Sequence, residues 1–217
     1  MKRTLAFTLC LLILLTLSPV VLAVEIVGTY DDVDSEAWYA AAVEDVTAKG
    51  LMNGTGGGKF TPDGTLTRAM LVTVLWRMSG CPEAAAPCPF TDVEAGSWYA
   101  SAVAWAAEVG AVNGIGSGLF APEADVTREQ MATIFYRWAN SMGMDTATGE
   151  TEIAMRENAS EWAVDAVNWA ISKNLLVPVL ITGLPHGGSG YFYNMPAAAH
   201  RGEIADFVSR FTTAYTG

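Results

Sequence analysis

Apolar side chains recur every three or four positions in several short segments, a period that predicts helices with one buried face. Gly50 and Gly110 follow two of these segments and suit helix C-termini, where a left-handed backbone is favoured. The two apolar stripes are Trp38, Ala42, Val43 and Val46, and then Trp98, Ala102, Val103 and Ala106.

A second set of stripes follows Thr67, Thr127 and His200. Thr67 and Thr127 suit N-cap positions, and Thr127 with Gln130 predicts a capping box. The stripes are Leu71, Val74, Leu75 and Met78; Met131, Ile134, Phe135 and Trp138; and Ile204, Phe207, Val208 and Phe211.

These segments belong to a tandem repeat. Residues 30–78 align with 90–138 at a constant offset of 60, and Trp162, Ala166, Val167 and Arg201 mark an eroded third copy. The copies are about 30–79, 90–141 and 150–213, and copy three carries extra residues between Pro178 and Pro196. A helix–loop–helix unit cannot close a core alone. We therefore expect one mostly α body over 24–217.

Composition and net charge argue against a disordered chain and against a nucleic-acid-binding protein. The chain is 51% apolar and only 16% charged, which excludes a disordered chain. Its net charge of −11 argues against a nucleic-acid partner, because such binding depends on neutralising phosphates.

Residues 1–23 are predicted to be a signal peptide. Lys2 and Arg3 precede an uncharged run, and Val21-Leu22-Ala23 has the spacing of a cleavage site. An uncleaved membrane anchor is the alternative, since the stretch is just long enough to span a bilayer. We expect a secreted protein that has no membrane partner after cleavage.

Cys81 and Cys88 would be the cysteines left after removal of Cys10. Their short separation in an exported chain predicts a local disulfide, and two free thiols are the alternative. No histidine lies nearby, so no metal site is expected.

The repeated elements Asp-Val, Trp-Tyr, Ala-Val, the glycine loop and Thr-Arg together resemble the S-layer homology family. The resemblance covers about 30–212. It implies a pseudo-threefold helical prism that attaches exported bacterial proteins to a secondary cell-wall polysaccharide, often one carrying pyruvate ketals. It further implies ligand grooves between neighbouring repeats.

Carried over by position, the ligand-binding arginines of the resemblance are Arg68, Arg128 and Arg201. A first-turn arginine lies beside backbone N–H groups that favour a carboxylate, although pairing with aspartates or carbonyls would make these residues structural. Trp38 and Trp98 are candidates for contact with sugar rings, but their place at the start of an apolar stripe favours the core. Erosion of copy three predicts that Arg201 serves the weakest site.

We therefore expect a non-enzymatic wall-binding module with no catalytic residue, cofactor or metal. A self-assembling envelope or S-layer component within a larger assembly, a peptidoglycan-binding protein and a small wall hydrolase are the alternatives.

Overall fold

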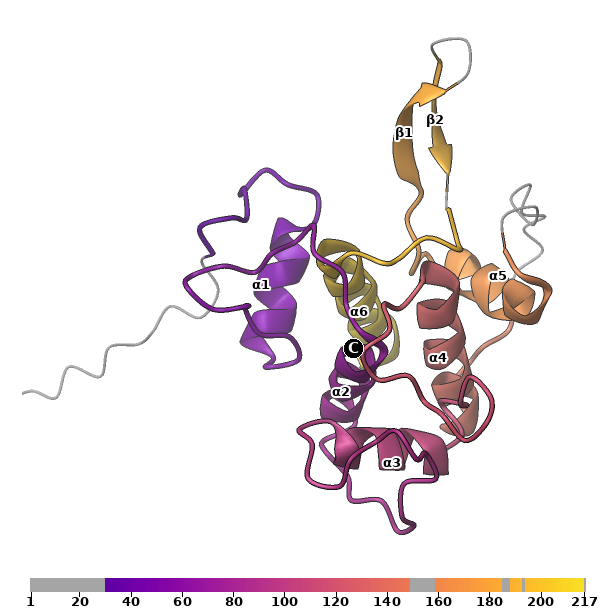
Figure 1. The fold of residues 1–217 in the computed structure, drawn as a ribbon. Coiled ribbons are helices and arrows are strands. Elements are labelled where there is room, and N and C mark those ends of the chain that lie inside the picture. Colours follow the sequence, from indigo (N-terminus) through magenta and orange to yellow (C-terminus); the bar gives the residue numbers. More distant parts are fainter. Residues whose placement is uncertain (1–29, 149–158, 185–187, 193, 217) are drawn as a thin grey trace, which may run out of the picture.

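The structure, a computed structural model, describes residues 30–148, 159–184, 188–192 and 194–216. The predicted signal peptide, 1–23, lies outside them. Helices dominate the described part (Figure 1), as the apolar spacing predicted. They are α1 (Ala40–Ala48), α2 (Arg68–Met78), α3 (Ala100–Glu108), α4 (Arg128–Ser141), the 3-10 turn η2 (Glu161–Ala163), α5 (Val164–Ser172) and α6 (Arg201–Thr216).

The predicted helix ends are confirmed. Thr67 Oγ1 accepts a hydrogen bond from the Met70 amide, and Thr127 forms a capping box with Gln130. Gly50 and Gly110 follow α1 and α3 in the left-handed region, with φ of +66° and +73°. In copy three, Asn174 takes this position with φ of +55°, because asparagine tolerates that region better than most side chains.

Each first helix packs against the second helix of the preceding copy. Helix α3 lies on α2, α5 lies on α4, and α1 lies on α6. The last pairing joins the first copy to the third, so the three copies form a closed ring around a shared core (Figure 1).

Backbone hydrogen bonds repeat this threefold order. Isolated antiparallel bridges join each copy to the next: Thr67 to Asp125, Thr127 to Ala198, and His200 to Thr65. The first two amides of each second helix also donate to carbonyls of the next copy. These bonds run from Arg68 to Ala124, Ala69 to Pro122, Arg128 to Ala197, Glu129 to Met195, Arg201 to Gly64 and Gly202 to Pro62.

Aromatic rings fill part of the core. Phe135 lies with its ring centroid 4.8 Å from that of Phe207 and 5.2 Å from that of Phe211. The second-helix stripes predicted from the sequence are buried, apart from Met78, which is partly buried. Their burial in α6 confirms that copy three contributes a full apolar face.

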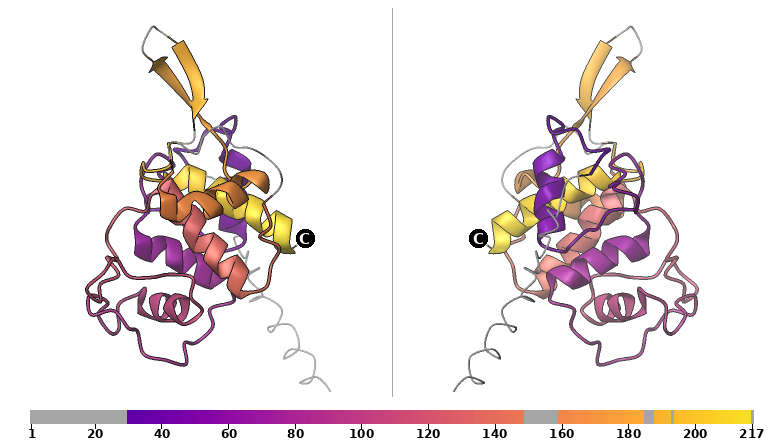
Figure 2. Two further views of the ribbon diagram at one scale, coloured as in Figure 1. Left: turned by 90° about the vertical axis from the view of Figure 1, so that its right-hand side faces the viewer. Right: turned by 90° about the vertical axis from the view of Figure 1, so that its left-hand side faces the viewer.

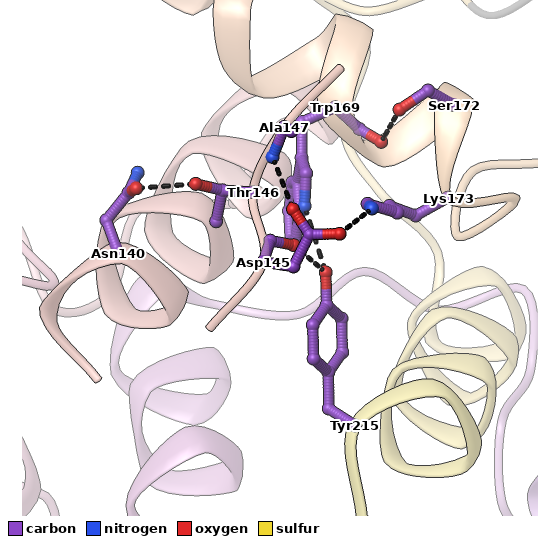
Figure 3. A network of polar contacts seen from close by, with 8 residues as sticks. All are labelled: Asn140, Asp145, Thr146, Ala147, Trp169, Ser172, Lys173 and Tyr215. Carbon is purple, nitrogen blue, oxygen red and sulfur yellow. Dashed lines mark hydrogen bonds and ion pairs between the residues drawn. The ribbon is translucent and has the colours of Figure 1, made fainter. Parts of the chain in front are cut away.

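A polar network joins the chain leaving α4 to α5 and α6 (Figure 3). Lys173 Nζ lies 2.6 Å from Asp145 Oδ2. Tyr215 Oη donates to the Asp145 carbonyl at 2.6 Å and accepts from Trp169 Nε1 at 3.2 Å. The network therefore links copy two to both helices of copy three.

The extra residues of copy three form an antiparallel hairpin, β1 (Val179–Leu184) and β2 (Gly188–Phe192). The repeat pattern predicted extra residues here but no strands. Val179, Ile181, Tyr191 and Phe192 are residue types that favour strands. The hairpin projects away from the helices (Figures 1 and 2).

Candidate functional site

Three grooves lie where the copies meet. Groove A has a volume of about 350 Å³, groove B about 340 Å³ and groove C about 420 Å³. Each takes a tryptophan from one copy, a motif arginine from another, and a loop with a late-helix arginine from the third. Groove A contains Trp98, Arg201, Asn53 and Arg77; groove B contains Trp162, Arg68, Asn113 and Arg137; groove C contains Trp38, Arg128, Val177 and Arg210.

The motif arginines are buried and hold the loop of the next copy. Arg68 Nε donates to the Phe120 carbonyl at 2.9 Å, and its Nη2 donates to the Asn113 carbonyl at 3.2 Å. The guanidinium also lies over the Phe120 ring, 4.7 Å from its centroid. These contacts match the carbonyl pairing that the sequence left open, so Arg68 has a structural role.

Arg201 makes the equivalent contacts around the ring. Its Nε and Nη2 each donate at 2.7 Å, to the carbonyls of Phe60 and Asn53. Its guanidinium lies 4.5 Å from the centroid of Phe60. The arginine of the eroded copy therefore lies in an intact site, because its partners come from copy one.

Arg128 is the arginine that departs from this pattern. Its Nη2 and Nε lie 2.6 Å and 3.2 Å from Glu203 Oε1, and its Nη1 donates to the Asn194 carbonyl. The ranking of Arg201 as the weakest site rested on the erosion of the copy that carries it. The structure assigns the eroded loop to Arg128 instead.

Grooves A and B are positively charged. Each is lined by two arginines, and no carboxylate belongs to the lining of either groove in the described part of the chain. Burial lowers the pKa of Arg68 and the charge of Arg137 lowers that pKa further, and these two effects outweigh the opposing charge of Asp92. Since an arginine in a protein stays protonated, Arg68 and Arg137 repel each other. A bound anion would relieve this repulsion.

The first-turn amides are not free to bind a ligand, contrary to expectation. In α2, the Arg68 and Ala69 amides donate to carbonyls of copy two, and the Met70 amide donates to the Thr67 cap. The positive character of the grooves therefore comes from the arginine side chains rather than from a free helix terminus.

The tryptophan side chains that recur in the three copies lie on the surface. Trp38, Trp98 and Trp162 are 58%, 59% and 55% exposed, so the interpretation that placed them in the core is wrong. The reason is that α1 begins at Ala40, and Trp38 lies in the turn before it. An exposed indole beside a groove offers a flat apolar face.

Asp32 and Asp92 fix the loops that meet the arginines. Asp32 accepts from the amides of Phe60 at 2.8 Å and Thr61 at 2.9 Å, and Asp92 binds Phe120 and Ala121 equivalently. Desolvation raises the pKa of Asp32, but these amides and the charge of Lys59 outweigh it, so the pKa is below its usual value. These contacts reach 28 and 29 residues along the chain.

Glycine is required in two of the three loops. A Cβ on Gly54 would lie 2.6 Å from the Lys59 carbonyl oxygen, and one on Gly114 would lie 2.5 Å from that of Leu119. Pro178 stands at this position in copy three, where the hairpin follows. The loop of groove C therefore takes a different path.

Copy three also lacks the tyrosine that adjoins the tryptophan in the other copies. Tyr39 packs on Gly202, where a Cβ would lie 3.0 Å from the ring. In copy three, Ala163 stands where copy one has Tyr39, and Glu129 of copy two stands where Gly202 does. Glu129 accepts two hydrogen bonds from Ser160. A polar contact thus replaces an aromatic one.

Cys81 and Cys88 are free thiols in the structure. The disulfide expected between them is not formed, and it stays a prediction for the oxidised protein. In the described residues no metal-ligand cluster is found, and no helix is long and apolar enough to cross a bilayer.

The candidate ligand residues chosen from the sequence did not include the late-helix arginines Arg77 and Arg137, although both line grooves. The signal for the arginines was their recurrence at the same offset in every copy, with Arg210 as the third member.

The family model of the S-layer homology domain matches residues 29–69 and 89–132. These are copies one and two, and the threefold contacts above identify the third. Copies one and two belong to the S-layer homology family.

Relatives of this S-layer homology chain include surface proteins and enzymes. It is 26% identical to the S-layer protein sap of Bacillus anthracis over 184 residues, which are 84% of the chain and 21% of that protein. It is 28% identical to an endoglucanase of Bacillus sp. (strain KSM-635), over 68% of the chain and 16% of the enzyme. It is 23% identical to the cellulosome-anchoring protein of Acetivibrio thermocellus, over 58% of the chain and 29% of that protein. The chain therefore spans less than a third of the length of these relatives.

Proposed function

We propose that this chain is a bacterial cell-wall binding module whose ligand is an anionic secondary cell-wall polysaccharide. The observation that carries this is the make-up of grooves A and B. Each joins two arginines without a lining carboxylate to an exposed tryptophan. A sugar that bears a carboxylate, such as a pyruvate ketal, presents an anion and a ring face together.

The proposed contacts combine the predicted residues with those found in the grooves. In groove B, Arg68 and Arg137 bind the carboxylate and Trp162 contacts the sugar ring. In groove A, Arg201, Arg77 and Trp98 have these roles. The Nη1 atoms of Arg68 and Arg201 have no acceptor among the described residues, which leaves a donor for the ligand.

Whole-molecule charge favours short-range recognition. The chain has a net charge of −11, so an acidic polymer gains no long-range attraction. The relatives named as an S-layer protein and a cellulosome-anchoring protein agree with a surface location and a binding role. The alignment with an endoglucanase covers only a small share of that enzyme, so it carries no activity over to this chain.

Sedimentation with purified cell wall tests the proposal. The protein should sediment with intact wall and stay in solution after the secondary polymer is extracted. Arg137→Gln should weaken wall binding about tenfold, because a charge-assisted hydrogen bond is lost. Lys59→Gln makes the same change in net charge on an exposed side chain outside the grooves and should leave binding unchanged.

Two results would contradict the proposal. Binding that survives extraction would identify peptidoglycan as the ligand. Large species in solution without wall material would favour the self-assembling envelope component.

A further inference from the structure

Groove C has the same place in the ring as grooves A and B but different chemistry. Glu203 stands where Met70 and Gln130 line the other grooves, and Asp206 stands where they have threonines. Groove C is therefore lined by two arginines and two carboxylates, with no formal net charge.

Both arginines of groove C already have anionic partners. Arg128 Nη2 lies 2.6 Å from Glu203 Oε1, and Arg210 Nε lies 2.7 Å from Asp206 Oδ2. The other oxygen of Glu203, Oε2, accepts from the His200 amide at 2.9 Å. The Glu203 carboxylate thus occupies the Arg128 guanidinium that a ligand carboxylate would need.

An anionic ligand would have to displace Glu203 from Arg128. Both side chains are largely buried, and a buried carboxylate that loses its partner is strongly disfavoured. Groove C is therefore closed to the ligand proposed for grooves A and B. Its volume of about 420 Å³ nevertheless lies within the range of small-ligand sites.

The walls of groove C suit an uncharged ring with one apolar face. Trp38 is 58% exposed, and Val177 and Pro178 replace the asparagine and glycine of the other loops. Asp206 Oδ1 has no hydrogen-bond partner among the described residues, so it remains available to a hydroxyl donor. A pyranose has an apolar C–H face and a rim of hydroxyl groups.

From this we infer that groove C binds an uncharged sugar residue, which stacks on Trp38. Glu203 and Asp206 are then the residues that exclude a carboxylate-bearing sugar. The inference rests on the proposed function, since it assumes that the neighbouring residues of one wall glycan reach different grooves.

Nuclear magnetic resonance of the tryptophan indole N–H groups tests the inference on the purified protein. One probe set is the uncharged methyl glycosides of glucose, N-acetylglucosamine and N-acetylmannosamine; the other probe is a methyl hexoside that carries a pyruvate ketal. An uncharged glycoside should shift the Trp38 signal, and the ketal should shift Trp98 and Trp162 but not Trp38. Raising the salt concentration should weaken only the ketal response.

Three variants sharpen the test. Trp38→Ala should reduce affinity for the uncharged glycoside about tenfold or more, because the apolar platform is lost. Trp98→Ala removes the equivalent indole of groove A and should leave that affinity unchanged. The double variant Glu203→Gln and Asp206→Thr gives groove C the polar residues of groove B, and its Trp38 signal should respond to the ketal. The conservative Glu203→Gln change keeps an acceptor for the His200 amide.

The inference is overturned if no uncharged glycoside shifts Trp38, or if the ketal shifts Trp38 in the unaltered protein. The proposed function fails separately, if the ketal shifts neither Trp98 nor Trp162.

Discussion

The guanidinium groups of Arg68 and Arg201 serve the fold and the proposed ligand at once. Two nitrogens of each bind carbonyls of the next copy. Arg77 and Arg137 lie in the same grooves and are less buried. Arg77 Nη1 donates to the Leu51 carbonyl at 3.1 Å, whereas Arg137 donates no hydrogen bond among the described residues. Arg137 is therefore the groove arginine whose removal should affect binding more than stability.

Arg201→Ala should lower the free energy of unfolding by roughly 2–3 kcal/mol, because it leaves the Phe60 and Asn53 carbonyls without their charged donor. Arg137→Ala should cost less than about 1 kcal/mol. Urea unfolding followed by circular dichroism measures both. Equal, small losses would mean that the loop contacts of Arg201 contribute little.

At this scale the sequence identified residues better than it identified their roles. The motif arginines and tryptophans all line grooves. Their burial was misjudged because it depends on the neighbouring copy: Trp38 precedes its helix instead of joining the apolar stripe, and Arg68 turns toward a loop 45 and 52 residues away. Contacts between copies have no local period.

The loops between paired helices depend on the aspartate clamps. Thr61 and Ala121 have φ of +58° and +59°, a strained region for residues other than glycine. Asp32 and Asp92 hold their amides. The hydrogen bonds to these carboxylates therefore offset part of the free-energy cost of this backbone conformation.

Acid should weaken these clamps. The pKa values of Asp32 and Asp92 are lowered in the folded state. Their contribution to stability is therefore complete above the pKa of an unfolded aspartate and is lost as the pH falls through the lower folded value. The urea midpoint should stay level from pH 7 to 5 and fall below about pH 4.

The double variant Asp32→Asn and Asp92→Asn should be less stable at pH 7 and lose less in acid. Glu44→Gln, on the exposed side of α1, is the control and should keep the full acid response. A double variant with an unchanged acid loss would assign that loss to other carboxylates, such as Asp45 and Asp145.

The hairpin is the element least connected to the ring. Val179 and Phe192 are register partners, so their Cα atoms lie about 5 Å apart. Replacing 179–192 with two to four glycines should change the unfolding free energy by less than about 1 kcal/mol, because the strands contact chiefly each other. A thermal melt measures this. A large loss would mean that the hairpin braces groove C.

Because each copy packs on the other two, we expect the molecule to be stable only as a closed ring. Deleting 149–217 removes the helices that cover α1 and α4, so the remainder should lose cooperative unfolding and associate in solution. Circular dichroism and size-exclusion chromatography measure the two effects, and the hairpin replacement is the matched control. A two-copy fragment that melts cooperatively as a monomer would contradict ring closure.

The sequence was most informative at this largest scale. A constant offset and repeated stripes were enough to predict three helical units in one body. They did not predict that α1 pairs with α6, or that the insertion forms strands. Those features depend on how the two ends of the repeat array meet and on residues outside the repeated pattern.

Copy three supplies Trp162 to groove B, Arg201 to groove A and its loop to groove C. The copies are therefore not independent modules. A mutation in one copy alters grooves that the other two copies also line. A single ancestral unit would have needed to trimerise to form any groove at all. With three copies in one chain, groove C can carry Glu203 and Asp206 while grooves A and B carry none of these carboxylates, a difference that identical subunits cannot have.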